Sequence, residues 1–215
     1  MARLRANISM SLDGYAAGPG QSLEQPLGKD GEELHEWALA TQSWRGAHGR
    51  EGGESGLDDE WIKAATENVG ATIMGRNMFG PVRGSWEGED WNGWWGDEPP
   101  FHTPVFVLTH HAREPLELEG GTTFHFVTDG IEAALERALE AAGGKDVTIG
   151  GGASTVQQYL RTGLVDELTV HVAPVLLGGG RRLFDDLDGG PVGLQPVELE
   201  ASPAAAHFRF ARAVA

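Results

Sequence analysis

Hydrophobic and polar residues alternate strictly at the start of the chain. Five apolar residues are each separated by one polar residue: Leu4, Ala6, Ile8, Met10 and Leu12. They alternate with the polar residues Arg3, Arg5, Asn7, Ser9 and Ser11. A two-residue period predicts a strand with one apolar and one polar face. It differs from the unbroken apolar run of a signal peptide, so we expect a strand here and not a targeting segment.

Further along, short apolar runs alternate with helical periods. The pattern predicts strands over residues 71–74, 105–111, 123–129 and 146–150, and helices that begin near residue 58, span 131–142 and span about 154–161. The last three runs, residues 166–176, 197–201 and 207–214, are strands with no helix between them. Strands that alternate with helices predict a parallel sheet, and a strand-only end predicts an antiparallel edge. We therefore expect a three-layer α/β sandwich.

Two long stretches carry little periodicity. Residues 19–56 are rich in Gly, Glu and Gln with one modest helical candidate at 31–40, and residues 84–100 hold four tryptophans. Loops of this length in a compact domain are usually functional or mobile. A chain of 215 residues suits one domain, so we predict a single domain over 1–215 with insertions at about 19–56 and 84–100. The tryptophans could form a lid or an oligomer contact, or simply pack beneath a long loop.

The amino-acid composition argues against several classes of function. The formal charge is −16, and an acidic protein offers no counterion release to drive binding to nucleic acid. The chain has no cysteine, which excludes disulfides, thiolate zinc sites and a cysteine nucleophile. The eight histidines show no ligand spacing, so we predict no metal. No stretch reaches the roughly 18 apolar residues needed to span a bilayer, and we expect a cytoplasmic protein.

Three successive glycines stand where a predicted strand meets a predicted helix, in "TIGGGAST" at residues 148–155. Bare backbone at this point serves either a tight turn or an anion on the amides of a helix N-terminus. The standard phosphate-binding patterns fail, because no GK[ST] occurs and Thr155 stands where the dinucleotide fingerprint needs glycine. A nucleophile elbow fails too, since Val156 replaces its second glycine. The steric and the anion-binding explanations both stay open on spacing alone.

Four motifs taken together resemble the dihydrofolate reductase superfamily. They are "ISMSLDGYAAG" at 8–18, "ATIMGRNMF" at 71–79, "VFVLTH" at 105–110 and "TIGGGASTVQQYL" at 148–160. The stretch "DELTVHVAPVLLGGGRRLF" at 166–184 is more similar to the branch that includes the reductase domain of bacterial riboflavin biosynthesis. The resemblance implies a dihydrofolate reductase-like three-layer sandwich, with a mostly parallel twisted central sheet and an antiparallel C-terminal edge strand. It also implies an NADPH crevice across the carboxyl ends of the strands.

The same resemblance implies a set of cofactor contacts. The diphosphate would contact the amides of Gly150, Gly151, Gly152, Ala153, Ser154 and Thr155. A cis peptide bond between two of the glycines would be typical of the family. The adenosine side would meet Gly75, Arg76 and Asn77, with Arg76 at the 2′-phosphate, and Thr109 and His110 would flank the ribose. A guanidinium suits phosphate and a helix N-terminus suits an anion, in agreement with these roles.

Two carboxylates are candidates for the reacting centre. The spacing of the resemblance points to Asp59 as the substrate-side acid, with Asp58 beside it, and Asp13 in "SLDG" is the rival. A carboxylate in an apolar cleft would have a raised pKa, which suits a proton relay near neutral pH. Helix capping explains Asp58 and Asp59 as well, and a turn before Gly14 explains Asp13.

These observations predict an NADPH-dependent reductase. Hydride would pass to a small heterocyclic, pterin- or pyrimidine-like, or sugar-derived substrate, and we expect a homodimer. The alternative is a protein that binds NADPH or another nucleotide without turnover.

Overall fold

A computed structural model describes residues 2–80, 84–86, 90–187 and 192–213. Residues 87–89 of the predicted 84–100 insertion, and residue 214 of the last predicted strand, lie outside the described part.

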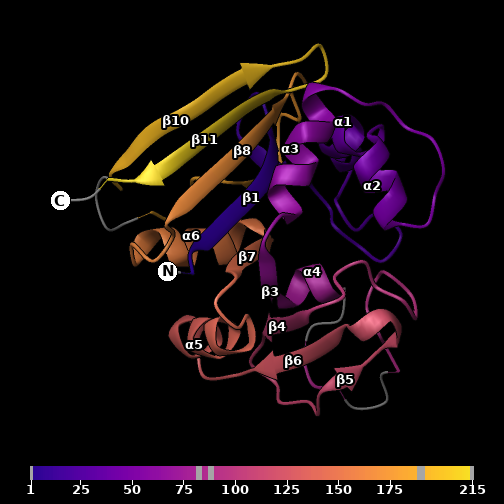
Figure 1. Ribbon diagram of the computed structural model, residues 1–215, viewed down its shortest axis with the longest axis vertical. Helices are drawn as coiled ribbons and strands as arrows, with labels where there is room; N and C mark the ends of the chain where they lie inside the picture. Colours follow the sequence, from indigo (N-terminus) through magenta and orange to yellow (C-terminus); the bar gives the residue numbers. More distant parts are fainter. Residues whose placement is uncertain (1, 81–83, 87–89, 188–191, 214–215) are drawn as a thin grey trace.

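One large mixed sheet organises the chain (Figure 1). Its nine strands follow the order β10-β11-β8-β1-β7-β3-β4-β6-β5. In chain order they are β1 (Leu4–Ser11), β3 (Val69–Gly75), β4 (Pro104–Leu108), β5 (Leu116–Glu117), β6 (Thr123–Val127), β7 (Asp146–Gly151), β8 (Glu167–Ala173), β10 (Leu194–Ala201) and β11 (Ala206–Arg212). The six strands from β8 to β6 pair in parallel. β11 and β10 at one edge, and β5 at the other, pair antiparallel. The predicted parallel sheet with an antiparallel C-terminal edge is confirmed.

Helices cover both faces of this sheet (Figure 1). On one face α5 (Ile131–Ala141) and α6 (Ala153–Arg161) pack on the largest apolar cluster. The other face carries α3 (Leu57–Thr66) with the short elements η1 (Gly31–His35), α1 (Glu36–Leu39) and α2 (Gln42–Ala47). α4 (Arg76–Phe79) follows β3 directly, and η2 (Glu119–Gly121) precedes β6. A two-stranded ribbon pairs β2 (Tyr15–Ala17) with β9 (Arg181–Arg182).

The two-residue period of the strands sorts their side chains between the two faces. In β3, Ile73 belongs to the cluster beneath α5 and α6, whereas Met74 belongs to a second cluster on the opposite face. That second cluster is built around Phe79 and Phe124 and is covered by Trp86, Trp91, Trp95 and other partly buried residues. Three of the four tryptophans of the 84–100 stretch therefore pack on the sheet, and Trp94 packs against Trp91.

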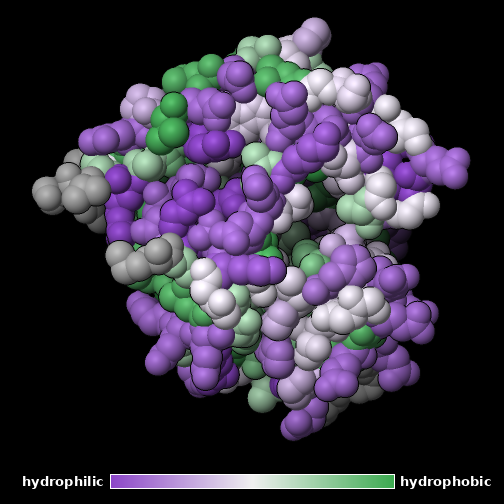
Figure 2. Space-filling view, viewed as in Figure 1, coloured by the Kyte–Doolittle hydropathy of each residue, from purple (hydrophilic) through white to green (hydrophobic). Residues whose placement is uncertain are grey.

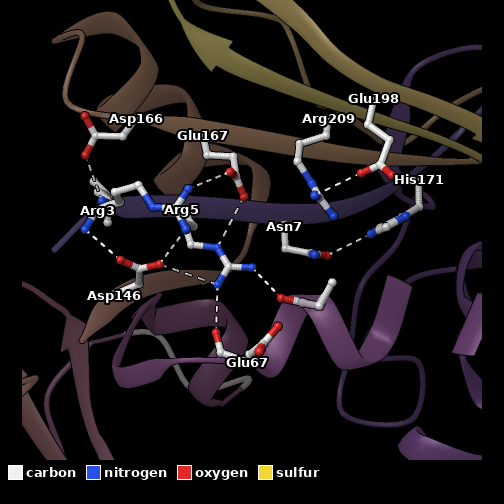
Figure 3. A network of polar contacts seen from close by, with 12 residues as sticks. Arg3, Arg5, Asn7, Glu67, Asp146, Asp166, Glu167, His171, Glu198 and Arg209 are labelled. Carbon is white, nitrogen blue, oxygen red and sulfur yellow. Dashed lines mark hydrogen bonds and ion pairs between the residues drawn. The ribbon is translucent and has the colours of Figure 1, made fainter. Parts of the chain in front are cut away.

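The 19–56 insertion also contributes to the core. Leu34 and Trp37 are 0% and 4% exposed, and Trp37 forms a third cluster with Trp61 of α3. Its indole Nε1 donates to Ser9 Oγ on the polar face of β1 at 3.1 Å. Arg5, on the same face, donates to the carbonyls of Ala64 and Glu67 near the end of α3. The polar face of β1 is thus covered by helices that hydrogen-bond to Arg5 (Figure 3) and Ser9.

Candidate active site

The three glycines connect β7 to α6 and form a turn with one strained and one open position. Gly151 has a φ of 134°, where a side chain would be strained, and a Cβ there would lie 3.1 Å from Met78 Sδ. At Gly152 the φ is −88°, and a Cβ would meet nothing within 4 Å. The peptide bond between these two residues is cis, as the resemblance implied. Backbone geometry therefore explains Gly151, whereas packing leaves Gly152 unexplained.

The first turn of α6 begins directly after this turn. It carries no acidic residue and no side-chain cap, so no carboxylate of the first turn itself offsets the positive end of the helix. Arg181 donates from Nη2 to Ser154 Oγ at 2.8 Å. The guanidinium of Arg182 lies 5.1 Å from the centre of the Tyr15 ring. Arg181 therefore lies beside the first turn of α6, while Arg182 lies at Tyr15. Both side chains are half-exposed and ion-paired, Arg181 with Asp186 at 3.7 Å and Arg182 with Asp185 at 3.3 Å.

Neither of these arginines was identified from the sequence. Their only signal there is the pair of adjacent arginines after the glycines in "LLGGGRRLF". Their approach to α6 depends on β9 pairing with β2, which no local pattern reveals.

The β3–α4 turn lies against the glycine turn. A Cβ on Gly75 would lie 2.5 Å from Thr155 Oγ1 and 3.9 Å from the Gly151 carbonyl oxygen, so the two turns touch. The Arg76 guanidinium lies over the ring of Trp86, whose indole donates to the His111 carbonyl at 2.8 Å. Asn77 is exposed. Arg76 is therefore held near the glycine turn by an aromatic surface.

Thr109 and His110 follow β4, the next strand of the sheet. Thr109 is buried and its amide donates to the Val127 carbonyl at 3.0 Å, while His110 is exposed. Because β7, β3 and β4 are neighbours in one parallel sheet, their carboxyl ends gather all the predicted cofactor residues along one edge. Figure 2 shows the surface hollowed between the half of the molecule that carries α1–α3 and the half that carries α4 and β6.

Asp13 is bound on both carboxylate oxygens. Ser11 Oγ donates to Oδ1 at 2.6 Å, and the amides of Leu177 and Gly178 donate at 3.1 and 2.7 Å. The pKa of Asp13 is lowered, chiefly by the Ser11 hydroxyl and further by the two amides. The carboxylate therefore stays ionised and ties the end of β1 to the loop after β8.

Asp59 is almost completely buried, at 1% exposure. Burial alone would raise its pKa, but Lys63 Nζ at 2.7 Å and the Ser43 amide at 2.6 Å outweigh burial, and the pKa is lowered. The expected raised pKa is therefore wrong. The capping interpretation of Asp58 and Asp59 is also wrong, because α3 starts after Gly56 without a side-chain cap.

Replacing Asp59 with Asn should lower the free energy of unfolding by about 1.5–3 kcal/mol at neutral pH, because the buried ion pair to Lys63 is lost. A group with a lowered folded-state pKa stabilises the protein above its unfolded pKa of about 3.9, and this contribution disappears as pH falls through the folded-state pKa. Urea titrations should therefore show wild type and variant converging in acid. A difference that stays constant with pH would contradict the ion pair, and Glu60→Gln, exposed on the same helix, is the control.

In the part of the chain that the structure describes, no helix is long and apolar enough to cross a membrane. Nor does any trio of His, Asp or Glu side chains among those residues have the arrangement of a metal site.

Comparison with known proteins identifies a family and several relatives. The family model described as the RibD C-terminal domain matches residues 2–208. YyaP, an uncharacterized protein of Bacillus subtilis (strain 168), is 39% identical over 95 residues, which are 42% of this chain and 50% of YyaP. The chain thus aligns with about half the length of this curated relative.

Solved structures with the same fold cover nearly the whole chain. A putative riboflavin biosynthesis protein from Shewanella sp. PV-4 has a TM-score of 0.62 at 23% identity and 99% coverage of both chains. A pyrimidine reductase-like protein from Corynebacterium diphtheriae has a TM-score of 0.53 at 16% identity, covering 100% of this chain and 93% of the other. Dihydrofolate reductase from Enterococcus faecalis, complexed with NADP(H), has a TM-score of 0.52 at 15% identity over 98% and 96% of the chains. The predicted dihydrofolate reductase-like fold is confirmed.

Proposed function

Because the chain belongs to the RibD C-terminal domain family, we propose that it is an NADPH-dependent reductase of a small heterocyclic or sugar-derived substrate. The observation that carries this proposal is the open space at Gly152 beside the uncapped first turn of α6. Because Gly152 has no side chain, nothing covers the first amides of α6, and a ligand can approach them closely. The N-terminal amides of a helix favour an anionic ligand there.

Different residues along the carboxyl edge of the sheet would contact different parts of the cofactor. The diphosphate would lie on the amides of Gly152, Ala153 and Ser154, and Arg181 would neutralise its charge. Gly150 and Gly151 shape the turn, and Thr155 packs it against Gly75. The adenosine side would meet Arg76 and Asn77, with Thr109 and His110 next to them after β4. Bound NADPH would supply the hydride.

We propose that neither of the two carboxylates is a proton donor. Both Asp13 and Asp59 have a lowered pKa and stay ionised near neutral pH. We propose that Asp13 fixes the loop at residues 177–178, and that Asp59 fixes residue 43 of the insertion against α3 beside the substrate.

Neither of the two predicted acids is protonated near neutral pH. This observation favours the alternative, a nucleotide-binding protein without turnover. Steady NADPH oxidation with any member of a panel of pterins, pyrimidines and sugar-derived ketones would support the reductase. Binding without oxidation across the whole panel would support the alternative. The homodimer and the cytoplasmic location stay predictions, and light scattering of the purified protein would test the former.

Replacing Arg76 with Ala should abolish a preference for NADPH over NADH. A charge-assisted contact to the 2′-phosphate is worth about 1.5–3 kcal/mol, which corresponds to roughly 10- to 150-fold in Kd. Fluorescence titration of the wild type, Arg76→Ala and the control Arg161→Ala with both nucleotides would measure it. Arg161 is exposed at the far end of α6 and should leave the preference intact. Equal affinities in the wild type would contradict the assignment.

A further inference from the structure

Arg113 lies beside the adenosine end of the proposed cofactor edge, and no function was assigned to it from the sequence. Its guanidinium carbon lies 4.8 Å from the centre of the Trp86 ring, and that of Arg76 lies closer still to the same ring. The two guanidinium groups can therefore be no farther apart than the sum of these two distances. Two arginines from different loops thus meet on one indole.

The two arginines approach this indole from neighbouring strands. Arg76 directly follows β3, and Arg113 lies in the loop after β4. β4 lies between β3 and β6 in the sheet, and the Arg113 guanidinium is also 5.1 Å from the ring centre of Phe126 on β6. A ligand that extends from the glycine turn after β7 across the end of β3 therefore passes Arg76 and then comes to Arg113.

Hydrogen bonds fix the loop that carries Arg113. The buried Thr109 hydroxyl accepts from the His111 amide at 3.2 Å, and the His111 carbonyl accepts from the Trp86 indole at 2.8 Å. Arg113 Nη1 itself donates to the Trp91 carbonyl at 2.8 Å. The loop after β4 is thus joined to the tryptophan-rich stretch, and the Arg113 guanidinium is held in place before any ligand binds.

The two guanidinium groups differ in exposure. Both terminal nitrogens of Arg76 are buried, whereas Arg113 is partly exposed. A phosphate that enters from solvent therefore meets Arg113 before it reaches Arg76. When two guanidinium groups each donate to one phosphate at about 2.8 Å, their carbon atoms are roughly 6–8 Å apart. The shared indole is compatible with that spacing, so both groups can contact one phosphate.

The chemistry of the ligand follows from these two cations. The 2′-phosphate is the group that distinguishes NADPH from NADH, and a phosphate monoester carries a charge of about −1.5 to −2 near neutral pH. Two guanidinium groups match this charge, and their planar forks match its oxygen atoms. The next cation beyond β6, Arg137 of α5, is already paired with Asp129 at 2.6 Å.

We propose that Arg113 is a second contact for the 2′-phosphate of NADPH, and that Trp86 is the positioning residue that holds Arg113 and Arg76 around it. The inference rests on the proposed function, because it assigns a further part of the same cofactor site. Arg76 and Arg113 together then determine the preference for NADPH over NADH.

Adenosine nucleotides with and without a 2′-phosphate test this contact without hydride transfer. The wild type should bind 2′,5′-ADP more tightly than 5′-AMP in calorimetric titrations. Arg113→Met should weaken binding of 2′,5′-ADP by roughly 10-fold and leave 5′-AMP unchanged, because methionine still packs on the rings but carries no charge. The control Arg45→Met removes a positive charge from α2, in the other half of the molecule, and should change neither affinity.

Combined variants separate a shared phosphate from two independent effects. Without Arg76 the phosphate loses its position, so Arg76→Ala combined with Arg113→Met should bind 2′,5′-ADP no more weakly than Arg76→Ala alone. Trp86→Leu should also weaken binding of 2′,5′-ADP but not of 5′-AMP. Trp86→Phe should keep most of the wild-type preference, since a phenyl ring still offers an aromatic face to both cations.

Two results would overturn the inference. One is an Arg113→Met protein that keeps the full preference for 2′,5′-ADP over 5′-AMP. The other is an equal loss of affinity for both nucleotides, which is the effect expected if Arg113 only holds the tryptophan-rich stretch in place. A wild-type protein that binds neither 2′,5′-ADP nor NADPH would instead overturn the proposed function, and the inference with it.

Discussion

Gly152→Val is expected to weaken NADPH binding by roughly 100-fold or more while the protein stays folded. The isopropyl group would occupy the space where the diphosphate contacts the first amides of α6, and each charge-assisted hydrogen bond lost there is worth about 1.5–3 kcal/mol. The free energy of unfolding should fall by only about 1 kcal/mol, because a Cβ at this position meets nothing within 4 Å. Titration of NADPH fluorescence and a urea midpoint measure the two quantities separately.

Two further variants serve as comparisons for Gly152→Val. Gly151→Val should lose stability as well as binding, because its φ of 134° and its contact with Met78 leave no place for a side chain. Gly46→Ala, at a distant glycine within α2 where a Cβ also meets open space, should leave NADPH binding unchanged and raise the free energy of unfolding by about 0.5–1 kcal/mol, because alanine favours a helix more than glycine does. Normal NADPH affinity in a folded Gly152→Val protein would mean that the glycines serve the turn alone.

Trp37→Ala should have the largest effect on stability, a loss of about 3–5 kcal/mol. The ring is 4% exposed, with centroids 4.3 Å from His171 and 5.0 Å from His207, and its indole donates to Ser9. Removing it would open a void beside two buried imidazoles and leave a polar face of β1 without its cover. Thermal and urea unfolding followed by circular dichroism would measure the loss.

The matched control for this variant is Leu39→Ala on the same short helix. Leu39 is 37% exposed, so its truncation should cost about 0.5 kcal/mol or less. Equal and small losses in both variants would mean that the 19–56 insertion lies on the surface as a loop and not in the core.

The sequence was most informative where structure depends on local pattern. The alternation in residues 4–12 predicted β1, and the glycines before residue 153 predicted the strand-to-helix turn, because period and backbone freedom are properties of neighbouring residues. That the residues expected to contact the cofactor gather along one edge could also be predicted, since parallel strands place their carboxyl ends together.

Contacts between distant segments could not be predicted in this way. The acidic first turn of α3 suggested capping, yet Asp58 reaches His207, 149 residues away, and Asp59 reaches back to the amide of residue 43. Asn7 looked like one more polar residue of an alternating strand, but its partner His171 is 164 residues away. The pKa of Asp59 was misjudged for the same reason, because burial was foreseen and the pairing that outweighs it was not.

The measurement that tests the account most directly is a crystal structure with NADPH bound. We expect diphosphate oxygens within about 3.2 Å of the amides of Gly152, Ala153 or Ser154, and the 2′-phosphate at Arg76. A diphosphate bound away from the glycine turn, or a nucleotide lying outside the edge formed by β7, β3 and β4, would contradict it.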